Sequence, residues 1–237
     1  MPQPDFKVLT IYGTGTASTR TKLNTVNLPW PFKPLAFAHK STGRYKAELY
    51  LNDEQLQNAG GDGDAMFGTQ GELVRIPAAA QKIIPEKRDF TLYVTDLAGA
   101  SNIVSLAIFG LQYTGLKISD LPPQPRHWIK WLNLYKPVGA SSSAVVSDTL
   151  SFPFIPTHIG FKATGRATIE LKADRIPFQN QAADIDAVLG TSGRLIAIPP
   201  EARKKYPAKT VFSAELTDLS GSTNVVTVTL FGIQTER

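Results

Sequence analysis

Cysteine is absent from the 237-residue sequence. Its absence excludes disulfide bonds, thiolate zinc sites and a cysteine nucleophile. No stretch reaches the roughly 18 consecutive apolar residues that a membrane-spanning helix needs, so we expect no membrane span. The chain begins Met-Pro-Gln-Pro-Asp, without a basic start followed by an apolar run, and we therefore expect no signal peptide.

Charged residues are also sparse, at 19% of the chain. Their net charge of +5 is compatible with an anionic partner. The basic residues are spread along the sequence, however, and form only short clusters such as Arg203-Lys204-Lys205. This distribution favours an ordinary solvated basic surface over a surface that binds nucleic acid.

The sequence does contain an internal repeat. When Pro31 is placed over Pro153, 34 of the 82 positions from there to Gln112 are identical, at a constant offset of 122 and without a gap. Upstream, Ile11-Tyr12 matches Leu134-Tyr135 with a shift of one residue. The repeated motifs are Thr-Gly-Arg at 42–44 and 164–166, Asp-x-Asp-Ala at 62–65 and 184–187, and T-D-L-x-G-x-x-N ending at Asn102 and Asn224. These matches indicate a duplication of one structural unit.

The segment between the copies has the composition of a linker. Residues 115–126 contain Leu-Pro-Pro-Gln-Pro, which is typical of an irregular connection. We therefore predict copy one at residues 1–114, a linker at 115–126 and copy two at 127–237. The ungapped match runs through loops, which usually tolerate insertion. Either the duplication is recent or both copies meet equivalent neighbours.

Apolar and polar residues alternate with a period of two along much of each copy, which predicts half-buried β-strands. The residues expected to be buried in the last two strands of each copy are Phe90, Leu92, Val94, Val104, Leu106 and Ile108, with Phe212, Ala214, Leu216, Val226, Val228 and Leu230. Further runs near 6–13, 23–30, 34–41, 45–51 and 73–77 bring the count to six or seven strands per copy. The predicted fold is all-β, with two tandem homologous, jelly-roll-like β-sandwich domains.

Turn chemistry joins the last two strands of each copy. The segments 96–102 and 218–224 are rich in Asp, Gly, Ser and Asn, so we expect each copy to end in a β-hairpin. Thr42-Gly43-Arg44 and its equivalent at 164–166 are expected to form a turn before a strand. Short helices are expected only at 78–84 and 201–205, each opened by proline.

The best candidate site is the repeated pair of aspartates, Asp62 and Asp64 in copy one and Asp184 and Asp186 in copy two. Two carboxylates two residues apart on a loop are able to converge on a calcium ion, which takes 6–8 oxygen ligands. The further oxygens nearby come from neutral groups, Asn58 in copy one and Gln179 and Asn180 in copy two. Bulky Ile185 also replaces Gly63. We therefore predict no metal site and no cofactor, and expect an aspartate to cap a short helical turn instead.

No residue pattern in the chain indicates catalysis. G-x-S-x-G, H-E-x-x-H and Walker motifs are missing, and we expect no enzyme activity. None of the histidines, His39, His127 and His158, recurs at an equivalent position, which favours partly buried structural residues over zinc or catalytic ones. Trp128 and Trp131 with Tyr135 open copy two, whereas Trp30 lies in copy one. These aromatics are expected to pack in the core or against the linker rather than stack on sugars or bases.

A duplicated, cysteine-free β-sandwich chain without a signal peptide resembles virus and bacteriophage structural proteins, in particular the double jelly-roll capsid proteins. The resemblance covers the whole chain as an architecture, and no family motif carries it. It implies a non-enzymatic virion component (capsid, decoration, vertex or baseplate) located in the virion and assembled in the host cytoplasm. The implied partners are other copies, in a trimer or a higher ring or lattice, and other virion proteins. The alternative is a tandem carbohydrate-binding module, in which two weak sites gain avidity through a short linker.

Overall fold

The structure is a computed structural model that describes residues 4–235. Copy one contains six long strands and three short ones. These are β1 (Asp5–Gly15), β2 (Arg20–Asn27), β3 (Phe32–Ser41), β4 (Tyr45–Leu51), β5 (Glu54–Gln55), β6 (Gly61–Asp62), β7 (Val74–Arg75), β8 (Asp89–Asp96) and β9 (Asn102–Gln112). Its helical segments are α1 (Gly63–Phe67) and the 3-10 turn η1 (Ala78–Ala80). The six long strands include every long strand that the alternation predicts.

Copy two repeats this series. After the 3-10 turn η2 (Ile118–Asp120) come β10 (Trp128–Val138), β11 (Ser143–Thr149), β12 (Phe154–Ala163), β13 (Ala167–Ala173), β14 (Ile176–Pro177), β15 (Ala183–Asp184), α2 (Ile185–Leu189), β16 (Leu195–Ala197), η3 (Pro200–Ala202), β17 (Val211–Asp218) and β18 (Asn224–Gln234). From β3 onward these elements start at the offset of 122 that the sequence gives, except that β16 begins one residue earlier than this offset and is one residue longer than β7. The first two strands of each copy are related by 123, as the one-residue shift predicts.

Each copy is a sandwich of two antiparallel sheets. In copy one the sheet orders are β1-β9-β3-β7 and β2-β8-β4-β5, and in copy two they are β10-β18-β12-β16 and β11-β17-β13-β14. The short strands β6 and β15 pair with β4 and β13. Most consecutive strands lie in opposite sheets, which is the connectivity of a jelly roll. The predicted fold class is therefore confirmed.

The prediction that each copy ends in a β-hairpin is wrong. β8 pairs with β2 and β4, whereas β9 pairs with β1 and β3, so the 96–102 loop crosses from one sheet to the other. The 218–224 loop makes the same crossing between β17 and β18. Alternation places an apolar face on each strand, but it does not reveal whether two successive strands share a sheet or face each other across the core.

The predicted helices are also shorter than expected. In place of 78–84 and 201–205, only the three-residue turns η1 and η3 form. The chain leaves the helical conformation because Ile84 exchanges backbone hydrogen bonds with Phe32, at 2.8 and 2.9 Å. Tyr206 does the same with Phe154, at 2.8 and 2.9 Å. Pairing with a strand of the sandwich therefore outweighs the local helical preference.

All twelve residues predicted to be buried in the last two strands of each copy are buried. They form the centres of two hydrophobic clusters, one inside each sandwich. The cluster of copy one also contains four residues from copy two, namely Ile129, Trp131, Phe231 and Ile233. The two sandwiches therefore share apolar contacts as well as a linker.

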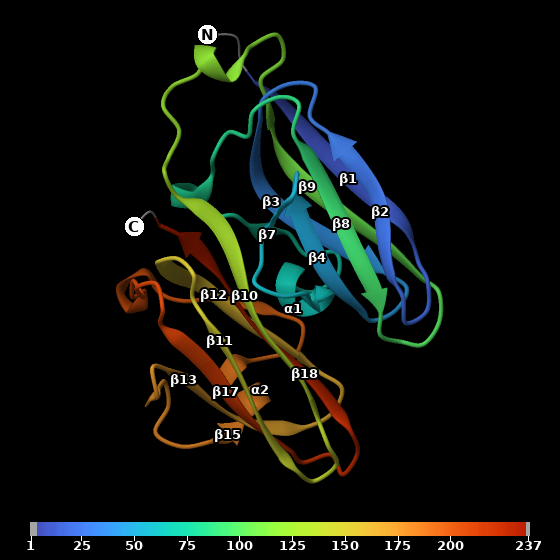
Figure 1. Cartoon of the computed structure of the whole chain (residues 1–237), viewed down its shortest axis with the longest axis vertical. Coiled ribbons are helices and arrows are strands. Elements are labelled where there is room, and N and C mark those ends of the chain that lie inside the picture. The colour runs from blue at the N-terminus through green and yellow to red at the C-terminus, as the bar shows by residue number, and fades with distance from the viewer. Residues whose placement is uncertain (1–3, 236–237) are drawn as a thin grey trace.

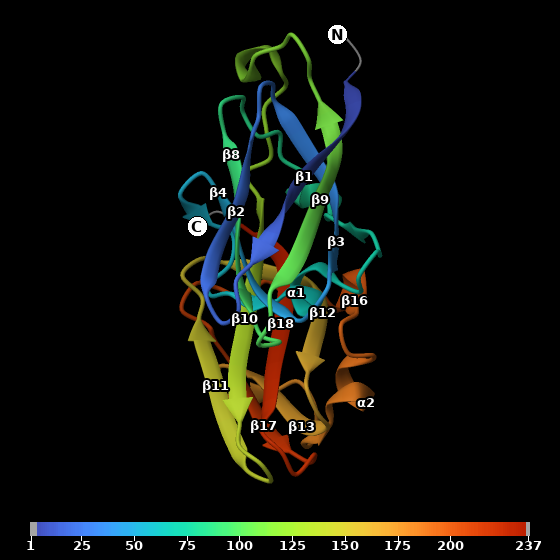
Figure 2. The same cartoon turned by 90° about the vertical axis from the view of Figure 1, so that its right-hand side faces the viewer.

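Figures 1 and 2 show the sandwiches stacked along the long axis of the molecule, with α1 between them. Copy one lies above and copy two below, and η2 lies in the connection that returns along copy one. Gln124 in this connection accepts a hydrogen bond from the Ile83 backbone N–H, at 2.9 Å. Among residues 4–235, no helix exceeds five residues, and none is long and apolar enough to cross a membrane.

Candidate functional site: the contact between the two sandwiches

The α1 end of copy one packs on the outer face of the β10-β18-β12-β16 sheet of copy two. Trp131 on β10 is the centre of this contact and is 1% exposed. Its indole N–H donates to the Met66 carbonyl at 2.9 Å, and its ring lies 5.5 and 6.0 Å from those of Phe37 and Phe67. An aromatic side chain of copy two therefore fills the open side of the copy-one sandwich, where its N–H is also satisfied.

Backbone pairing extends the contact along β10, which is an edge strand. The Trp131 N–H donates to the Leu56 carbonyl at 3.1 Å, and the Asn58 N–H donates to the Trp131 carbonyl at 3.3 Å. The Asn58 side chain then accepts from the Asn133 N–H at 2.7 Å and donates to its carbonyl at 3.0 Å. Segment 56–58 thus covers a sheet edge that would otherwise be open to pairing with other chains.

Charged groups complete the contact. Lys162 pairs with Asp64 at 2.7 Å, and Lys130 pairs with Glu54 at the same distance. Arg44 reaches across the contact and donates to the Val225 carbonyl at 3.0 Å. Each charge comes from one sandwich and its partner from the other, so these pairs fix the relative orientation of the copies.

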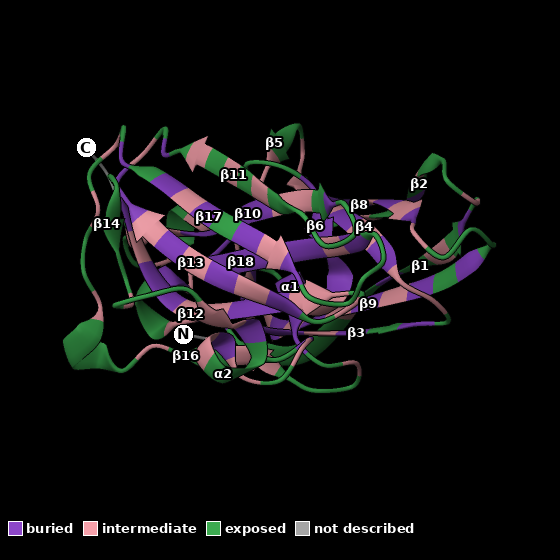
Figure 3. Ribbon diagram, turned by 90° about the horizontal axis from the view of Figure 1, so that it is seen from below, coloured by how far each residue is buried: buried purple, intermediate pink, exposed green. Residues whose placement is uncertain are grey.

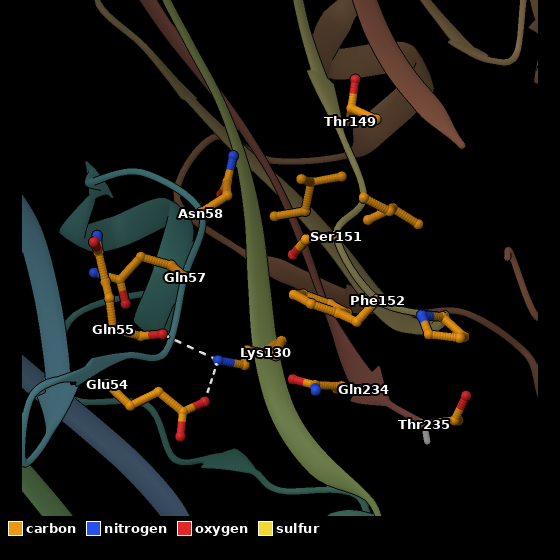
Figure 4. A pocket seen from close by; sticks show the side chains of 13 residues that line it. Glu54, Gln55, Gln57, Asn58, Lys130, Thr149, Ser151, Phe152, Gln234 and Thr235 are labelled. Carbon is orange, nitrogen blue, oxygen red and sulfur yellow. Dashed lines mark hydrogen bonds and ion pairs between the residues drawn. The ribbon is translucent and has the colours of Figure 1, made fainter. Parts of the chain in front are cut away.

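A cavity of about 530 Å³ lies at one side of this contact. Figure 4 shows Lys130 pointing toward Glu54 and the Gln55 carbonyl, at 2.7 and 3.0 Å. The other lining residues are neutral side chains from both copies, including Asn58, Phe152 and Gln234. Since the two lining charges neutralise each other, this cavity offers a polar, uncharged surface.

The candidate aspartates cap helices, as predicted. Asp62 accepts a hydrogen bond from the Asp64 N–H at 3.0 Å and caps α1, and Asp184 accepts from the Asp186 N–H at 3.1 Å and caps α2. Arg44 pairs with Asp62, and Arg166 pairs with Asp184 at 2.6 Å. Within the described residues no group of three or more His, Asp or Glu side chains has an arrangement that could hold a metal ion. The absence of a metal site stays a prediction.

The same capping geometry has different electrostatics in the two copies. Burial raises the pKa of Asp62 above its usual value, against the opposing effect of Arg44. The hydrogen bond from Arg166 lowers the pKa of Asp184, which lies near the surface. The difference arises because copy two covers the α1 end of copy one, whereas the α2 end of copy two is uncovered.

The second aspartate of each pair takes part in no cap. Asp64 turns to copy two and pairs with Lys162, whereas the equivalent Asp186 is exposed. Asn58, the other expected oxygen ligand of copy one, binds the backbone of Asn133 in copy two. Sequence reasoning placed these residues together but missed their role between the sandwiches, because the signal lies in the partner surface.

The repeated Thr-Gly-Arg and Asn residues form a clamp between loops in each copy. The Asn102 side chain accepts from the Thr42 and Gly43 N–H groups at 3.1 and 2.9 Å. Asn224 accepts from the Thr164 and Gly165 N–H groups at 3.1 and 3.0 Å. These identities in the repeat are therefore explained by the fold, since they tie together two loops that cross between the sheets.

The histidines lie on separate elements. His39 on β3 is buried, and its Nε2 donates to the Gly68 carbonyl at 2.7 Å while its Nδ1 accepts from the Tyr45 hydroxyl at 2.9 Å. Burial lowers the pKa of His39 and of His158, which lies on β12. His127 lies just before β10 and is half-buried. The prediction of structural histidines fits these environments.

The tryptophans do not form a shared platform. Trp131 is buried at the contact, Trp128 is half-buried in the same cluster, and Trp30 is 37% exposed on copy one. Tyr135, on the outer face of β10, is half-buried. The expectation of packed aromatics is met at Trp131 and Trp128 and is only partly met at Trp30.

Two of the solved structures that resemble this chain are viral capsid proteins. The STIV (Sulfolobus turreted icosahedral virus) MCP matches with 12% sequence identity over 96% of both chains and a TM-score of 0.52. The chain therefore has a double jelly-roll fold, which it shares with the STIV MCP. The major capsid protein P2 of bacteriophage PM2 matches with 10% identity over 98% of both chains and a TM-score of 0.49. The sequence matches no protein-family model and no curated protein.

Proposed function

We propose that this chain is a structural protein of a virus particle that assembles with further copies of itself into a ring or lattice. The observation that carries the proposal is the fold, shared with the STIV MCP over 96% of both chains. The duplication supports it, because two fused sandwiches halve the number of subunits that a closed ring needs. The trimer is the favoured ring, since three chains present six similar sandwiches.

We propose the same division into units that the sequence predicts, with residues 1–114 and 127–237 as the two sandwiches and 115–126 as the connection. The chain then acts in the virion as a binding and building unit without enzyme activity. The contact between the sandwiches supports the division into two joined units, since it consists of apolar packing, strand-edge pairing and neutralised charge pairs.

Light scattering coupled to size exclusion, over a range of protein concentrations, tests the proposal. We expect a concentration-dependent mass that reaches a discrete oligomer, with rings or sheets visible by negative-stain microscopy. A protein that stays monomeric at every concentration would contradict self-assembly. Binding to a glycan array by that monomer would then favour the carbohydrate-binding alternative.

A further inference from the structure

The outer sheet face of copy one is apolar and uncovered. We call it the open face and define it by the exposed side chains of Phe6, Val8, Tyr12, Leu73 and Ile103, which are 42–64% exposed. In copy two the same face is covered. Phe6 and Val8 correspond to Ile129 and Trp131, which are 0% and 1% exposed because copy one packs on them.

The burial of whole strands shows the same contrast. β1 is exposed along most of its outer face, whereas β10 is buried on both faces from Ile129 to Leu134. β9 alternates between buried and more exposed residues, whereas β18 is buried nearly throughout. One sheet of the chain is therefore covered by a neighbour, and its duplicate lacks that neighbour.

The opposite end of the molecule is uncovered as well. We call it the open end and define it by α2, β14 and residues 178–193. Figure 3, which views the molecule from this side, shows β14 and parts of α2 exposed. The equivalent helix of copy one, α1, is mostly buried. Phe178 is 49% exposed here, whereas its equivalent Leu56 is completely buried against copy two.

We propose that the open face of one molecule binds the open end of a second molecule, repeating between chains the contact that joins the two sandwiches within a chain. The occupant of the open face is thus a second copy of this protein. The inference rests on the proposed assembly function and specifies the surface and residues through which it occurs.

The polar residues of the internal contact recur where the new contact needs them. On the donor side Arg44, Asn58, Asp64 and Thr69 recur as Arg166, Asn180, Asp186 and Thr191. On the receiving side Lys162 and Gly193, whose carbonyl accepts from Thr69 at 3.3 Å, recur as Lys40 and Gly71. Lys40 and Asp186 are both exposed, so the two ends of the chain present the two halves of the Lys162–Asp64 ion pair.

Asn180 gives the clearest indication that the open end binds the open face of a second molecule. Its equivalent Asn58 binds the backbone N–H and carbonyl of Asn133, which lies on an edge strand. Position 133 corresponds to Thr10 on β1, which is also an edge strand, and a backbone contact does not depend on the side chain there. Asn180 is exposed. It is therefore placed to bind the Thr10 backbone of a second molecule.

The open end also contains a cavity, which we call the socket. At the equivalent position in copy one, the side chain of Trp131 fills the space. An apolar cavity of about 320 Å³ in copy two is lined in part by Ile159, Phe178, Val188 and Leu189. The equivalent residues in copy one are Phe37, Leu56, Met66 and Phe67, which surround Trp131. In the proposed contact, Val8 of the second molecule takes the place of Trp131 and enters this socket.

Two differences make the contact between chains weaker than the one within the chain. Val8 buries less apolar area than Trp131, and burial contributes about 25 cal/mol per Å². Ile176 also replaces Glu54, so the charge pair with Lys130 has no equivalent. Joining unlike surfaces head to tail gives a ring if the rotation between molecules closes and a filament if it does not.

Charge reversal at Lys40 and Asp186 tests the pairing. We expect Lys40→Glu and Asp186→Lys each to raise the concentration for half-assembly by about tenfold or more, because each places like charges together at every contact. The double variant restores opposite charges, and we expect it to return to within about threefold of the wild-type value. Lys22→Glu, on the exposed face of the other sheet, is the matched control and should leave assembly unchanged.

Two substitutions of Val8 test the socket, one expected to strengthen assembly and one expected to weaken it. Val8→Trp restores the side chain that fills this position in copy two, and we expect assembly at lower concentration. Val8→Lys places an ammonium group in this largely apolar cavity, which Lys204 also lines, and we expect assembly to weaken by more than tenfold. Because Val8 is 42% exposed in the single molecule, circular dichroism and melting temperature should change little.

The outcomes separate the two proposals. If wild-type protein assembles and the Lys40, Asp186 and Val8 variants assemble identically, another surface mediates assembly, and this inference is wrong while the proposed function stands. If wild-type protein is monomeric at all concentrations, both are wrong. Weakening by both single charge reversals with recovery in the double variant supports this inference.

Discussion

At the scale of single residues, the two copies reach the same backbone with different side chains. Gly63 in α1 has no room for a side chain, since a Cβ atom there would lie 2.2 Å from the Tyr45 ring. In copy two the equivalent residues are Ile185 and Ala167, both buried. In copy one the helix has the small residue and the strand the large one, whereas in copy two the helix has the large residue and the strand the small one. The glycine therefore reflects packing and not a flexible ligand loop.

This exchange predicts a compensating pair of substitutions. Gly63→Ile alone should destabilise the protein by about 1–3 kcal/mol or more, because it overpacks the site against Tyr45. Tyr45→Ala alone leaves a cavity and should cost about 3–5 kcal/mol. The double variant recreates the copy-two arrangement and should be more stable than the sum of the two effects predicts. Urea unfolding of all four proteins gives the coupling energy, and strict additivity would show that the two sites are independent.

The hydrogen bonds that Asp218 accepts lead us to expect a difference in acid stability between the two copies. Its carboxylate accepts from the Ser220 hydroxyl at 2.6 Å and from three backbone N–H groups, those of Ser141, Ser220 and Gly221. These bonds lower the pKa of Asp218 far below its usual value. Because the folded-state pKa is the lower one, the stabilisation is present above about pH 4 and is lost as pH falls through the folded-state pKa.

Asp218→Asn should therefore lower stability at pH 7 and make the remaining stability less dependent on pH between about 4 and 2. Asp96 is the matched control, since it occupies the equivalent position and its side chain accepts a hydrogen bond from the Ala100 N–H at 3.0 Å. Thermal melts of both variants across this pH range make the comparison. An equal effect of Asp96→Asn would contradict the assignment of the acid sensitivity to the hydrogen bonds that Asp218 accepts.

Some residue roles follow from sequence and others do not. Capping by Asp62 and Asp184 was predictable, because aspartate before a short helical segment accepts a nearby N–H group. The ion pair between Asp62 and Arg44 was not, since it joins β6 to the start of β4 across a loop. The role of Asp64 depends on Lys162, which lies in the other sandwich. No local pattern contains that contact.

At the scale of elements, period-two alternation predicted the strands well because each strand has one face in the core and one outside. All twelve residues that it assigned to the core side of β8, β9, β17 and β18 are buried. The sheet to which each strand belongs was not predictable in this way. A tight turn between two alternating runs suits a hairpin and a crossing between sheets equally, and in both copies the chain crosses.

Leu106 on β9 and Leu230 on β18 should each make a large contribution to the core of their own sandwich. Both side chains point into a sandwich, and Leu106 is 0% and Leu230 3% exposed. Truncation of either to alanine should cost about 2–5 kcal/mol through lost burial and the cavity left behind. Denaturant unfolding measures the change, with Ile103→Ala as a control on the outer face of β9, where Ile103 is 42% exposed. Near-neutral effects at both leucines would contradict the assigned strand faces.

At the scale of the whole molecule, the internal repeat in the sequence predicted the duplication. The duplication in turn predicted two matching sandwiches. The contact between them was not, for a physical reason. β10 is apolar on both faces, which in sequence resembles a fully buried central strand, yet it is an edge strand covered by the other copy. Comparison of the repeats contains the signal, since Trp131 stands where copy one has Val8.

Trp131 should couple the unfolding of the two sandwiches. It belongs to copy two by sequence, but it packs in the core cluster of copy one and donates its N–H to Met66 there. With this side chain in place, unfolding of either sandwich exposes apolar surface on the other, so we expect a single cooperative calorimetric transition. Trp131→Ala should cost about 3–5 kcal/mol, as truncation of large buried aromatics does. Because each sandwich retains its own inner core, the transition should then split into two. Trp30→Ala is the control, since Trp30 is 37% exposed and lies outside that cluster. A Trp131→Ala protein that unfolds in one transition with the wild-type midpoint would show that the linker and the polar contacts alone couple the sandwiches.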